Sequence, residues 1–138
     1  LELDPAYRPA MAGLEGFGYL NILWWFSGCD DARSRENLVE RSPYVRGPER
    51  LGVFATRSPM RPNPLALSCA AVTRLDPKAG VIGLSYIDAE DGSPLLDLKP
   101  YTPSLDRVED PPLPAWCAHW PGDVESGGDF PWEDEFNF

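Results

Sequence analysis

The stretch from Gly52 to Ser68, GVFATRSPMRPNPLALS, contains the residues best suited to chemistry. Three prolines fall within six residues of it and flank Arg61 and Asn63. Proline fixes φ near about −65° and drives the residue before it to an extended conformation. The sequence therefore predicts a stiff, non-helical loop that holds Arg57, Arg61 and Asn63 in fixed directions. Guanidinium groups held in this way are suited to binding carboxylates and phosphates.

The charge distribution around this loop is uneven. The 138-residue chain has a formal net charge of −10, yet residues 41–74 contain six arginines and a single acid, Glu49. A basic segment in an acidic chain predicts one anionic contact surface rather than general binding of nucleic acid. The alternative is that the acidic segments neutralise these arginines within the protein, and the sequence leaves both readings open.

Two further blocks accompany the loop. GLEGFGYLNILWWF runs from Gly13 to Phe26, and DAEDGSPLLDLKPYTPSLD runs from Asp88 to Asp106. Together with the proline loop, these blocks resemble the TsaA-like family, the TrmO-type tRNA methyltransferases. The resemblance covers roughly Leu1 to Asp106. Its two main motifs are long and ordered, which makes it far more specific than a short glycine motif.

The resemblance implies an enzyme that transfers a methyl group from S-adenosyl-L-methionine to the N6 nitrogen of threonylcarbamoyladenosine, next to the tRNA anticodon. The cofactor brings the activated methyl, so the protein has to place it about 3 Å from the nucleophile and needs no metal. The resemblance also implies a homodimer. Two alternatives stay open: a methyltransferase of the same fold with a non-tRNA small-molecule substrate, and a non-catalytic S-adenosyl-L-methionine-binding module.

Carried over by motif, the resemblance assigns the site residues. The candidate catalytic carboxylates are Asp91 and Asp88, because a carboxylate that accepts the N6 proton would assist a poor nucleophile. The expected cofactor contacts are Ser27, Gly28, Arg57, Leu65, Ala66, Leu67, Asp91, Gly92, Ser93 and Pro94. The expected substrate contacts are Arg61, Asn63 and Lys99, with Arg41, Arg46 and Arg50 facing tRNA phosphates.

Several of these residues have a structural alternative. Arg57 and Arg61 can brace two loops by pairing with Asp91 or Asp97, since ion-pair networks are common without function. Asp91 also belongs to an Asp-Gly pair, which frequently forms turns, and the asparagine of the RPNP run can cap its own turn. Lys99 can pair with Asp97 instead of facing a ligand.

The elements that must position these residues are expected to be mostly strands. The 16 prolines and 12 glycines argue against long helices. Both faces of Tyr19–Phe26 are largely apolar, which predicts a central strand covered on both sides. Further strands are predicted at Val53–Ala55, Leu65–Leu75 and Val81–Ile87, and a short helix with Asp4 as N-cap at Pro5–Gly13. With the resemblance, the expected fold is mainly β: a small β-barrel with few short helices and long proline-rich loops.

The end of the chain differs in composition. Residues 1–110 are expected to form the barrel domain, lacking the N-terminal strand of the family, and residues 111–138 a Pro/Trp-rich acidic extension. From Gly122 onward there are six acids and no base. Low pattern and high charge predict an extension ordered only by docking, with a partner subunit as one candidate surface. Its expected anchors are Phe130, Trp132, Phe136 and Phe138.

Cellular setting follows from composition. No apolar run reaches the roughly 20 residues that a membrane span needs. The three cysteines are widely spaced and the chain has a single histidine, which makes no zinc-ligand pattern. We therefore expect a cytoplasmic protein that uses neither a metal nor a membrane.

Overall fold

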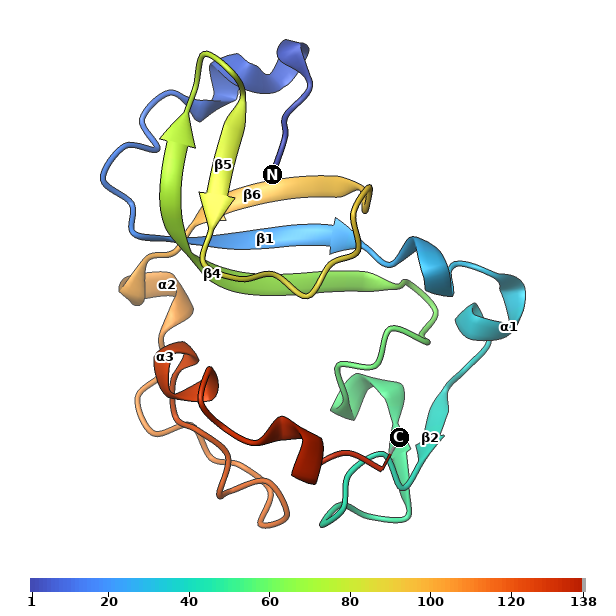
Figure 1. The fold of residues 1–138 in the computed structure, drawn as a ribbon. Helices are drawn as coiled ribbons and strands as arrows, with labels where there is room; N and C mark the ends of the chain where they lie inside the picture. Colours follow the sequence, from blue (N-terminus) through green and yellow to red (C-terminus); the bar gives the residue numbers. More distant parts are fainter. Residues whose placement is uncertain (138) are drawn as a thin grey trace. The chain divides into compact units, whose positions relative to one another are not determined.

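The computed structural model describes residues 1–137, which form two compact units (Figure 1). Unit 1 comprises residues 1–27 and 65–107, and unit 2 comprises residues 28–64 and the chain from Val108 onward. The described residues are mainly β, with few and short helices, as the sequence predicted.

Unit 1 is built on a four-stranded antiparallel sheet with the strand order β5–β4–β1–β6. Its strands are β1 (Tyr19–Trp25), β4 (Leu65–Asp76), β5 (Val81–Leu84) and β6 (Leu95–Pro100). The 3-10 helix η1 (Pro5–Met11) precedes them, and helix α2 (Pro103–Asp106) follows. Figure 1 shows β4 bending, so that its first part pairs with β1 and its last part with β5. The strands described here form open sheets, so the predicted closed barrel is not confirmed.

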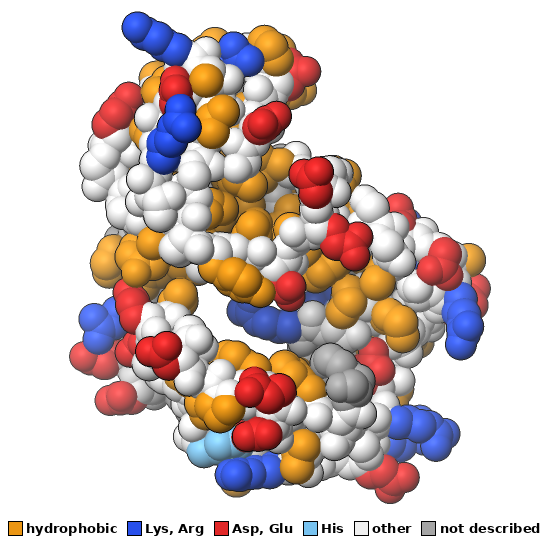
Figure 2. Space-filling model, viewed as in Figure 1, with side chains coloured by type: hydrophobic (Ala, Val, Ile, Leu, Met, Phe, Trp, Pro, Cys, Tyr) orange, Lys and Arg blue, Asp and Glu red, His pale blue; other side chains and the backbone are white. Residues whose placement is uncertain are grey.

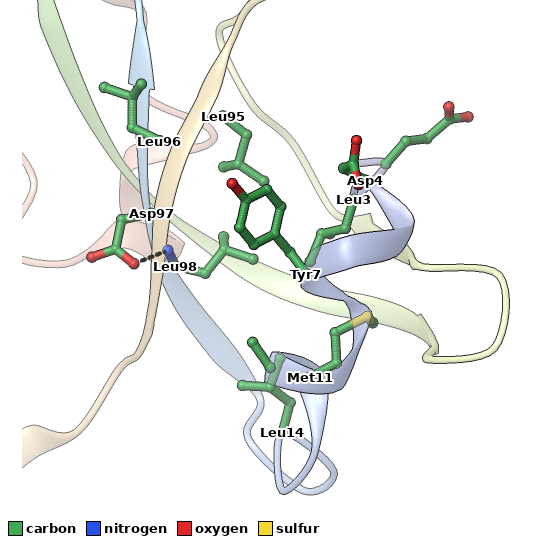
Figure 3. Close-up of a pocket in the computed structure, with 11 residues that line it drawn as sticks. Leu3, Asp4, Tyr7, Met11, Leu14, Leu95, Leu96, Asp97 and Leu98 are labelled. Atoms are coloured by element: carbon green, nitrogen blue, oxygen red, sulfur yellow. Dashed lines mark hydrogen bonds between the residues drawn. The ribbon is translucent and has the colours of Figure 1, made fainter.

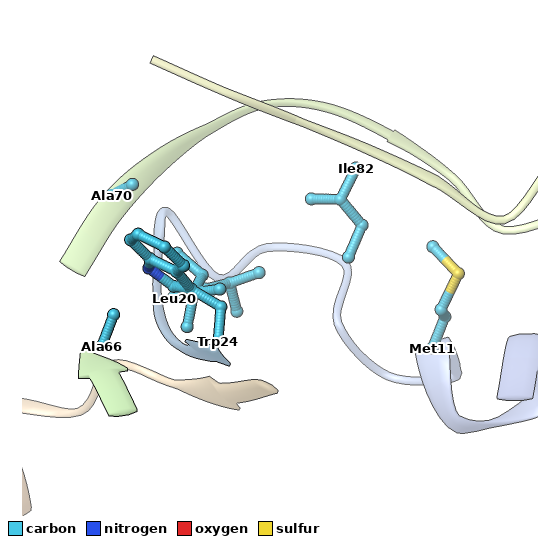
Figure 4. Close-up of a cluster of buried hydrophobic side chains, with 7 residues drawn as sticks. Met11, Leu20, Trp24, Ala66, Ala70 and Ile82 are labelled. Carbon is cyan, nitrogen blue, oxygen red and sulfur yellow. The ribbon is translucent and has the colours of Figure 1, made fainter. Parts of the chain in front are cut away.

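Strand β1 lies between β4 and β6, which confirms its predicted central place. Its alternate residues Leu20, Ile22 and Trp24 are buried in one hydrophobic cluster. Figure 4 shows Leu20 and Trp24 of this cluster with Ile82 of β5 and Met11 of η1. The opposite face of β1 is only half-buried. The core of unit 1 therefore lies on one side of the sheet, and the second face of β1, predicted to be covered as well, is only partly covered.

The predicted N-cap of the first helix is confirmed, and the helix is the 3-10 helix η1, which ends at Met11 rather than at Gly13. The Asp4 side chain accepts a hydrogen bond from the Ala6 backbone N at 2.8 Å, which caps η1. Leu3 N donates to Gly80 O at 2.8 Å, which ties the segment to the β4–β5 turn. Gly80 has φ +74, and a Cβ there would meet Arg8 Nε at 2.6 Å. Only glycine fits this turn without strain.

Unit 2 contains short elements. The 3-10 helix η2 (Ser27–Cys29) begins at the unit boundary. Then follow α1 (Ala32–Arg35), β2 (Val39–Arg41), β3 (Arg50–Gly52), η3 (Val53–Ala55), α3 (Val124–Gly127) and η4 (Trp132–Asp134). Strands β2 and β3 pair antiparallel.

The predicted strand at Val53–Ala55 is wrong, because this segment is the 3-10 helix η3 and the strand lies just before it. The Val53 carbonyl accepts hydrogen bonds from Thr56 N at 3.2 Å and Thr56 Oγ1 at 3.0 Å. It also accepts one from Arg61 Nη2. A carbonyl occupied by local donors is not available to a sheet, so the apolar run turns instead of extending.

The acidic extension is packed on its own chain. Tyr44, which is 8% exposed, stacks on Trp116 with ring centroids 5.0 Å apart and contacts Phe136 at 5.6 Å. Trp132 packs on Phe130 at 4.8 Å. Val45 N also donates to Glu135 O at 2.9 Å, beside an antiparallel bridge between Tyr44 and Phe136. Three of the four predicted anchors therefore dock within unit 2 rather than on a partner subunit; Phe138 lies outside the described residues.

Glu135 is a buried acid in this aromatic cluster, with 5% exposure. Its carboxylate is 2.8 Å from His119 Nε2 and accepts a hydrogen bond from Trp120 Nε1 at 3.1 Å. The hydrogen bond with His119 lowers the pKa of Glu135 most, and the hydrogen bond from Trp120 lowers it further.

This lowered pKa predicts acid sensitivity. A carboxyl group with a lower pKa in the folded state stabilises the fold above its unfolded pKa, and this contribution is lost as pH falls through the folded pKa. We expect the melting temperature to decrease once the pH is lowered below about 4.3, the ordinary pKa of glutamate. Glu135→Gln should lose less stability than the parent protein between pH 6 and pH 3.5. An equal loss in both proteins would show that Glu135 does not contribute.

Candidate functional site

The proline loop is held by hydrogen bonds among its own residues. Arg61 Nη2 donates to the carbonyl oxygens of Val53 and Thr56, the latter at 3.0 Å. Ser58 N donates to Thr56 Oγ1 at 3.2 Å, and Pro64 is fully buried. The loop thus combines proline stiffness with internal cross-links.

Arg61 stabilises this loop through hydrogen bonds to backbone carbonyls, not through the ion pairs with Asp91 or Asp97 that the sequence analysis considered. Its side chain is half-buried, and two carbonyl oxygens lie against one of its terminal nitrogens. A substrate contact by Arg61 stays a prediction, since it would have to use the rest of the guanidinium.

Arg57 is exposed and lies beside the aromatic cluster of unit 2. Burial raises the pKa of the Tyr44 hydroxyl, while the backbone N–H and the charge of Arg57 act in the opposite direction. Tyr44 and Arg57 are therefore neighbours. The cluster formed with the extension supports the residue expected to contact the cofactor.

Three segments with predicted cofactor contacts meet at one end of the unit 1 sheet. Trp25 of β1 lies opposite Leu65 of β4, and its backbone N donates to Pro94 O at 3.0 Å. Leu65 and Leu67 are 43% and 52% exposed, so they offer an apolar surface of the kind that an adenine ring prefers. Ala66 points into the core and is 8% exposed, so any contact from it would have to come from its backbone.

The loop before β6 contains the candidate catalytic carboxylates. Ser93 N donates to Glu90 O at 3.1 Å and Gly92 has φ +81, which confirms the predicted turn at Asp91–Gly92. Asp88 and Asp91 are both exposed. They are open to an incoming substrate, and Asp91 also serves the turn.

Lys99 pairs with Asp97, as one of its two predicted alternatives stated. The Lys99 Nζ to Asp97 Oδ2 distance is 2.7 Å, and the two side chains are 64% and 50% exposed. The hydrogen bond from Lys99, followed by that from Leu98 N, lowers the pKa of Asp97. A surface pair of this kind adds little stability, and a ligand role for Lys99 stays a prediction.

The arginines expected to face phosphates lie on or between β2 and β3. Arg41 and Arg50 are direct cross-strand partners, both are exposed, and Arg46 lies in the connection. Like charges directly opposite each other on a sheet are destabilising, so an anion bound between them would be stabilised. Acidic and basic side chains are interspersed on the face in Figure 2, so phosphate binding would depend on such local groups.

The predicted site residues are divided between the two units. Unit 1 contains Ser27, Leu65, Ala66, Leu67, Asp88, Asp91, Gly92, Ser93, Pro94 and Lys99; unit 2 contains Gly28, Arg41, Arg46, Arg50, Arg57, Arg61 and Asn63. In unit 1, Leu65 and Pro94 lie at the same end of the sheet, whereas Lys99 pairs with Asn21 further along β1. The meeting of Arg57 with Asp91 stays a prediction.

A cavity of about 470 Å³ lies in unit 1 between η1 and β6 (Figure 3). Its walls include Met11, Leu14, Leu95 and Leu98, and Figure 3 shows the Tyr7 ring directed toward β6. None of the predicted site residues lines it. Three carboxylates and no base are among its lining residues, which disfavours an anionic ligand there.

Within residues 1–137, no group of three or more histidine, cysteine or carboxylate side chains could hold a metal ion. The helices found in that range are all too short or too polar to cross a membrane.

Sequence reasoning missed the polar residues that support the proline loop from outside. Arg35 Nε donates to Pro62 O at 3.0 Å, and Asn37 Nδ2 donates to Met60 O at 3.0 Å. Glu40 accepts a hydrogen bond from Ser58 Oγ at 2.8 Å. These residues come from a polar segment without periodicity, which contains no signal for such contacts.

Comparison with known proteins gives a family match and similar sequences. The model of the tRNA-methyltransferase O N-terminal domain matches residues 1–107. A probable S-adenosyl-L-methionine-binding protein of Pyrococcus abyssi is 36% identical over 109 residues, 79% of this chain and 55% of that protein. A tRNA (adenine(37)-N6)-methyltransferase of Eikenella corrodens is 40% identical over 98 residues, 70% of this chain and 53% of that protein. The chain spans about half the length of these relatives.

One solved structure is also similar to this chain. The crystal structure of TrmO from Pseudomonas aeruginosa aligns with a TM-score of 0.63 and 35% sequence identity. The alignment covers 83% of this chain and 46% of that structure.

Proposed function

The chain belongs to the tRNA-methyltransferase O N-terminal domain family, and from this we propose that it transfers a methyl group from S-adenosyl-L-methionine to tRNA. The specific acceptor in the proposal is the N6 nitrogen of threonylcarbamoyladenosine beside the anticodon. The observation that carries the proposal is the family match over residues 1–107, which includes both signature blocks. Relatives named as S-adenosyl-L-methionine-binding proteins and as tRNA methyltransferases support it.

The residues present suit this cofactor. S-adenosyl-L-methionine supplies a methyl group on a sulfonium leaving group. The exposed Leu65 and Leu67 side chains offer the apolar surface that an adenine ring requires. Arg57 would bind the cofactor carboxylate, and Asp91 would accept the proton that the acceptor nitrogen loses.

The same proposal extends to features that the resemblance implies. We include the closed β-barrel, the homodimer and the cytoplasmic location. We also keep the division into a domain at 1–110 and an extension at 111–138, which is supported by the end of the family match at residue 107.

Cofactor binding tests the proposal first. We expect isothermal calorimetry to give saturable binding of S-adenosyl-L-methionine to the purified chain. Absence of heat at millimolar cofactor would overturn the proposal. Nucleoside mass spectrometry of tRNA incubated with protein and cofactor then tests the acceptor, and a new methylated adenosine derivative is expected.

A non-catalytic binding module is the second candidate. The observation that favours it is the name of the Pyrococcus abyssi relative, which records binding alone. Cofactor binding without methylation of tRNA or any small-molecule acceptor would select this function. Methylation of a small molecule, but not tRNA, would select the non-tRNA methyltransferase, which the net charge of −10 favours.

The arginine pair of β2 and β3 predicts a salt effect on tRNA binding. Each phosphate contact contributes roughly 0.7 to 0.9 to the slope of log affinity against log salt. Replacing Arg41 and Arg50 with alanine should therefore reduce that slope by about 1.5 and leave cofactor binding unchanged. Arg74→Ala is the matched control, since Arg74 is an exposed arginine of unit 1 paired with Asp76. An unchanged slope in the double variant would remove these arginines from the interface.

A further inference from the structure

Glu40 links the polar segment of unit 2 to the proline loop. Its Oε1 atom accepts hydrogen bonds from Asn37 Nδ2 at 2.7 Å and from Ser58 Oγ at 2.8 Å. Asn37 Nδ2 also donates to Met60 O at 3.0 Å. Both ends of the Ser58–Met60 turn are therefore held by the same Glu40–Asn37 pair.

The Glu40 carboxylate also determines which hydrogen bond the Ser58 hydroxyl donates and which it accepts. A hydroxyl has one hydrogen to donate, and a carboxylate such as that of Glu40 has none, so it can only accept. Ser58 Oγ therefore donates to Glu40 and leaves its lone pairs for Met60 N, which donates to it at 3.3 Å. Hydrogen bonds to an ionised acceptor are about twice as strong as neutral ones. The half-buried Glu40 thus fixes the conformation of the residues that directly follow Arg57.

We propose that Glu40 is a positioning residue that sets the direction of Arg57 for cofactor binding without touching the cofactor. This inference rests on the proposed function. It differs from a general stabilising role because Glu40 contacts the turn between Arg57 and Arg61, not the aromatic cluster of the unit.

The test is Glu40→Ala, assayed with S-adenosyl-L-methionine and tRNA. Loss of a hydrogen bond to a charged group is expected to weaken cofactor binding about tenfold. A positioning role raises KM for the cofactor with little change in kcat. A variant that merely unfolds would lower kcat at unchanged KM, and that result would overturn the proposal. Glu40→Gln, whose amide oxygen can still accept both hydrogen bonds but without the charge, should lose less affinity than Glu40→Ala.

A double-mutant cycle tests whether Glu40 acts through Arg57. If it does, Glu40→Ala causes no further loss of cofactor affinity in a chain that already has Arg57→Ala. A full tenfold loss in that background would overturn the proposal. Glu36→Ala is the matched control, because Glu36 is an exposed glutamate of the same segment, and it should leave affinity unchanged.

A measurement without cofactor keeps this inference separate from the proposed function. Hydrogen exchange of the Met60 amide should be about tenfold faster in Glu40→Ala than in the parent protein, and unchanged in Glu36→Ala. Unchanged exchange at Met60 would overturn the role of Glu40 even if the cofactor binds. Faster exchange in a protein that binds no cofactor would instead overturn the proposed function, and with it the role assigned to Glu40.

Discussion

Replacing Arg57 with alanine is expected to weaken binding of S-adenosyl-L-methionine by about one to two orders of magnitude. Arg57 is exposed in a loop whose neighbouring residues are cross-linked, so its guanidinium can meet an anionic group with little loss of conformational freedom. A charge-assisted hydrogen bond contributes roughly 1.5 to 3 kcal/mol, which corresponds to this range of affinity. Isothermal calorimetry with the cofactor measures the effect.

The controls separate binding from folding. Because surface substitutions usually change stability by about 0.5 kcal/mol or less, the thermal midpoint of Arg57→Ala should stay close to that of the parent. Arg57→Lys keeps the charge but loses the planar donor fork, so it should bind with intermediate affinity. Parent-like affinity in Arg57→Ala would show that the loop does not contact the cofactor.

The strands of unit 1 were predictable because their pattern is strong. Leu20, Ile22 and Trp24 alternate with less buried residues, and the structure buries them against β4. The apolar run at Val53–Ala55 led to a wrong strand prediction, because the Val53 carbonyl oxygen accepts hydrogen bonds from Thr56 and Arg61. Side-chain donors from later residues can override a short apolar pattern, and no local rule reveals them.

The sequence shows the composition of the extension, but it did not reveal where its aromatic residues pack. Its acids and weak pattern suggested order only on docking, yet its rings pack on Tyr44, more than 70 residues earlier in the chain. Aromatic side chains bury large areas whatever the charge of their neighbours. Which distant ring they will find depends on the tertiary fold.

The placement of the candidate residues was predictable where they lie on strands. Alternation along β4 separates the exposed Leu65 and Leu67 from the buried Ala66, and the pairing of β1 brings Pro94 to the same end of the sheet. The supporting contacts of Glu40 were not predictable, because a single carboxylate in an irregular segment has no periodic signal. The motifs therefore assigned contacts to a ligand but gave no sign of the residues that support the loop.

Replacing Trp24 with alanine is expected to destabilise unit 1 by about 3 to 5 kcal/mol, the usual range for a buried aromatic residue. Trp24 is 3% exposed, packs on Phe26 with ring centroids 4.3 Å apart, and donates from Nε1 to Ser68 Oγ at 3.0 Å. Since whole domains are stable by only about 5 to 15 kcal/mol, this loss is a large share of the total. Urea denaturation measures it.

Two variants divide the Trp24 effect into packing and hydrogen bonding. Ser68→Ala removes the acceptor and leaves the indole N–H unsatisfied, which should cost about 1 to 3 kcal/mol. Trp24→Phe keeps most of the ring and should cost less than Trp24→Ala. Because the next residue, Trp25, pairs with Leu65 and donates to Pro94 O, loss of Trp24 should also disturb the predicted cofactor end of the sheet. Trp24→Ala with parent-like stability would mean that β1 is not the centre of the core.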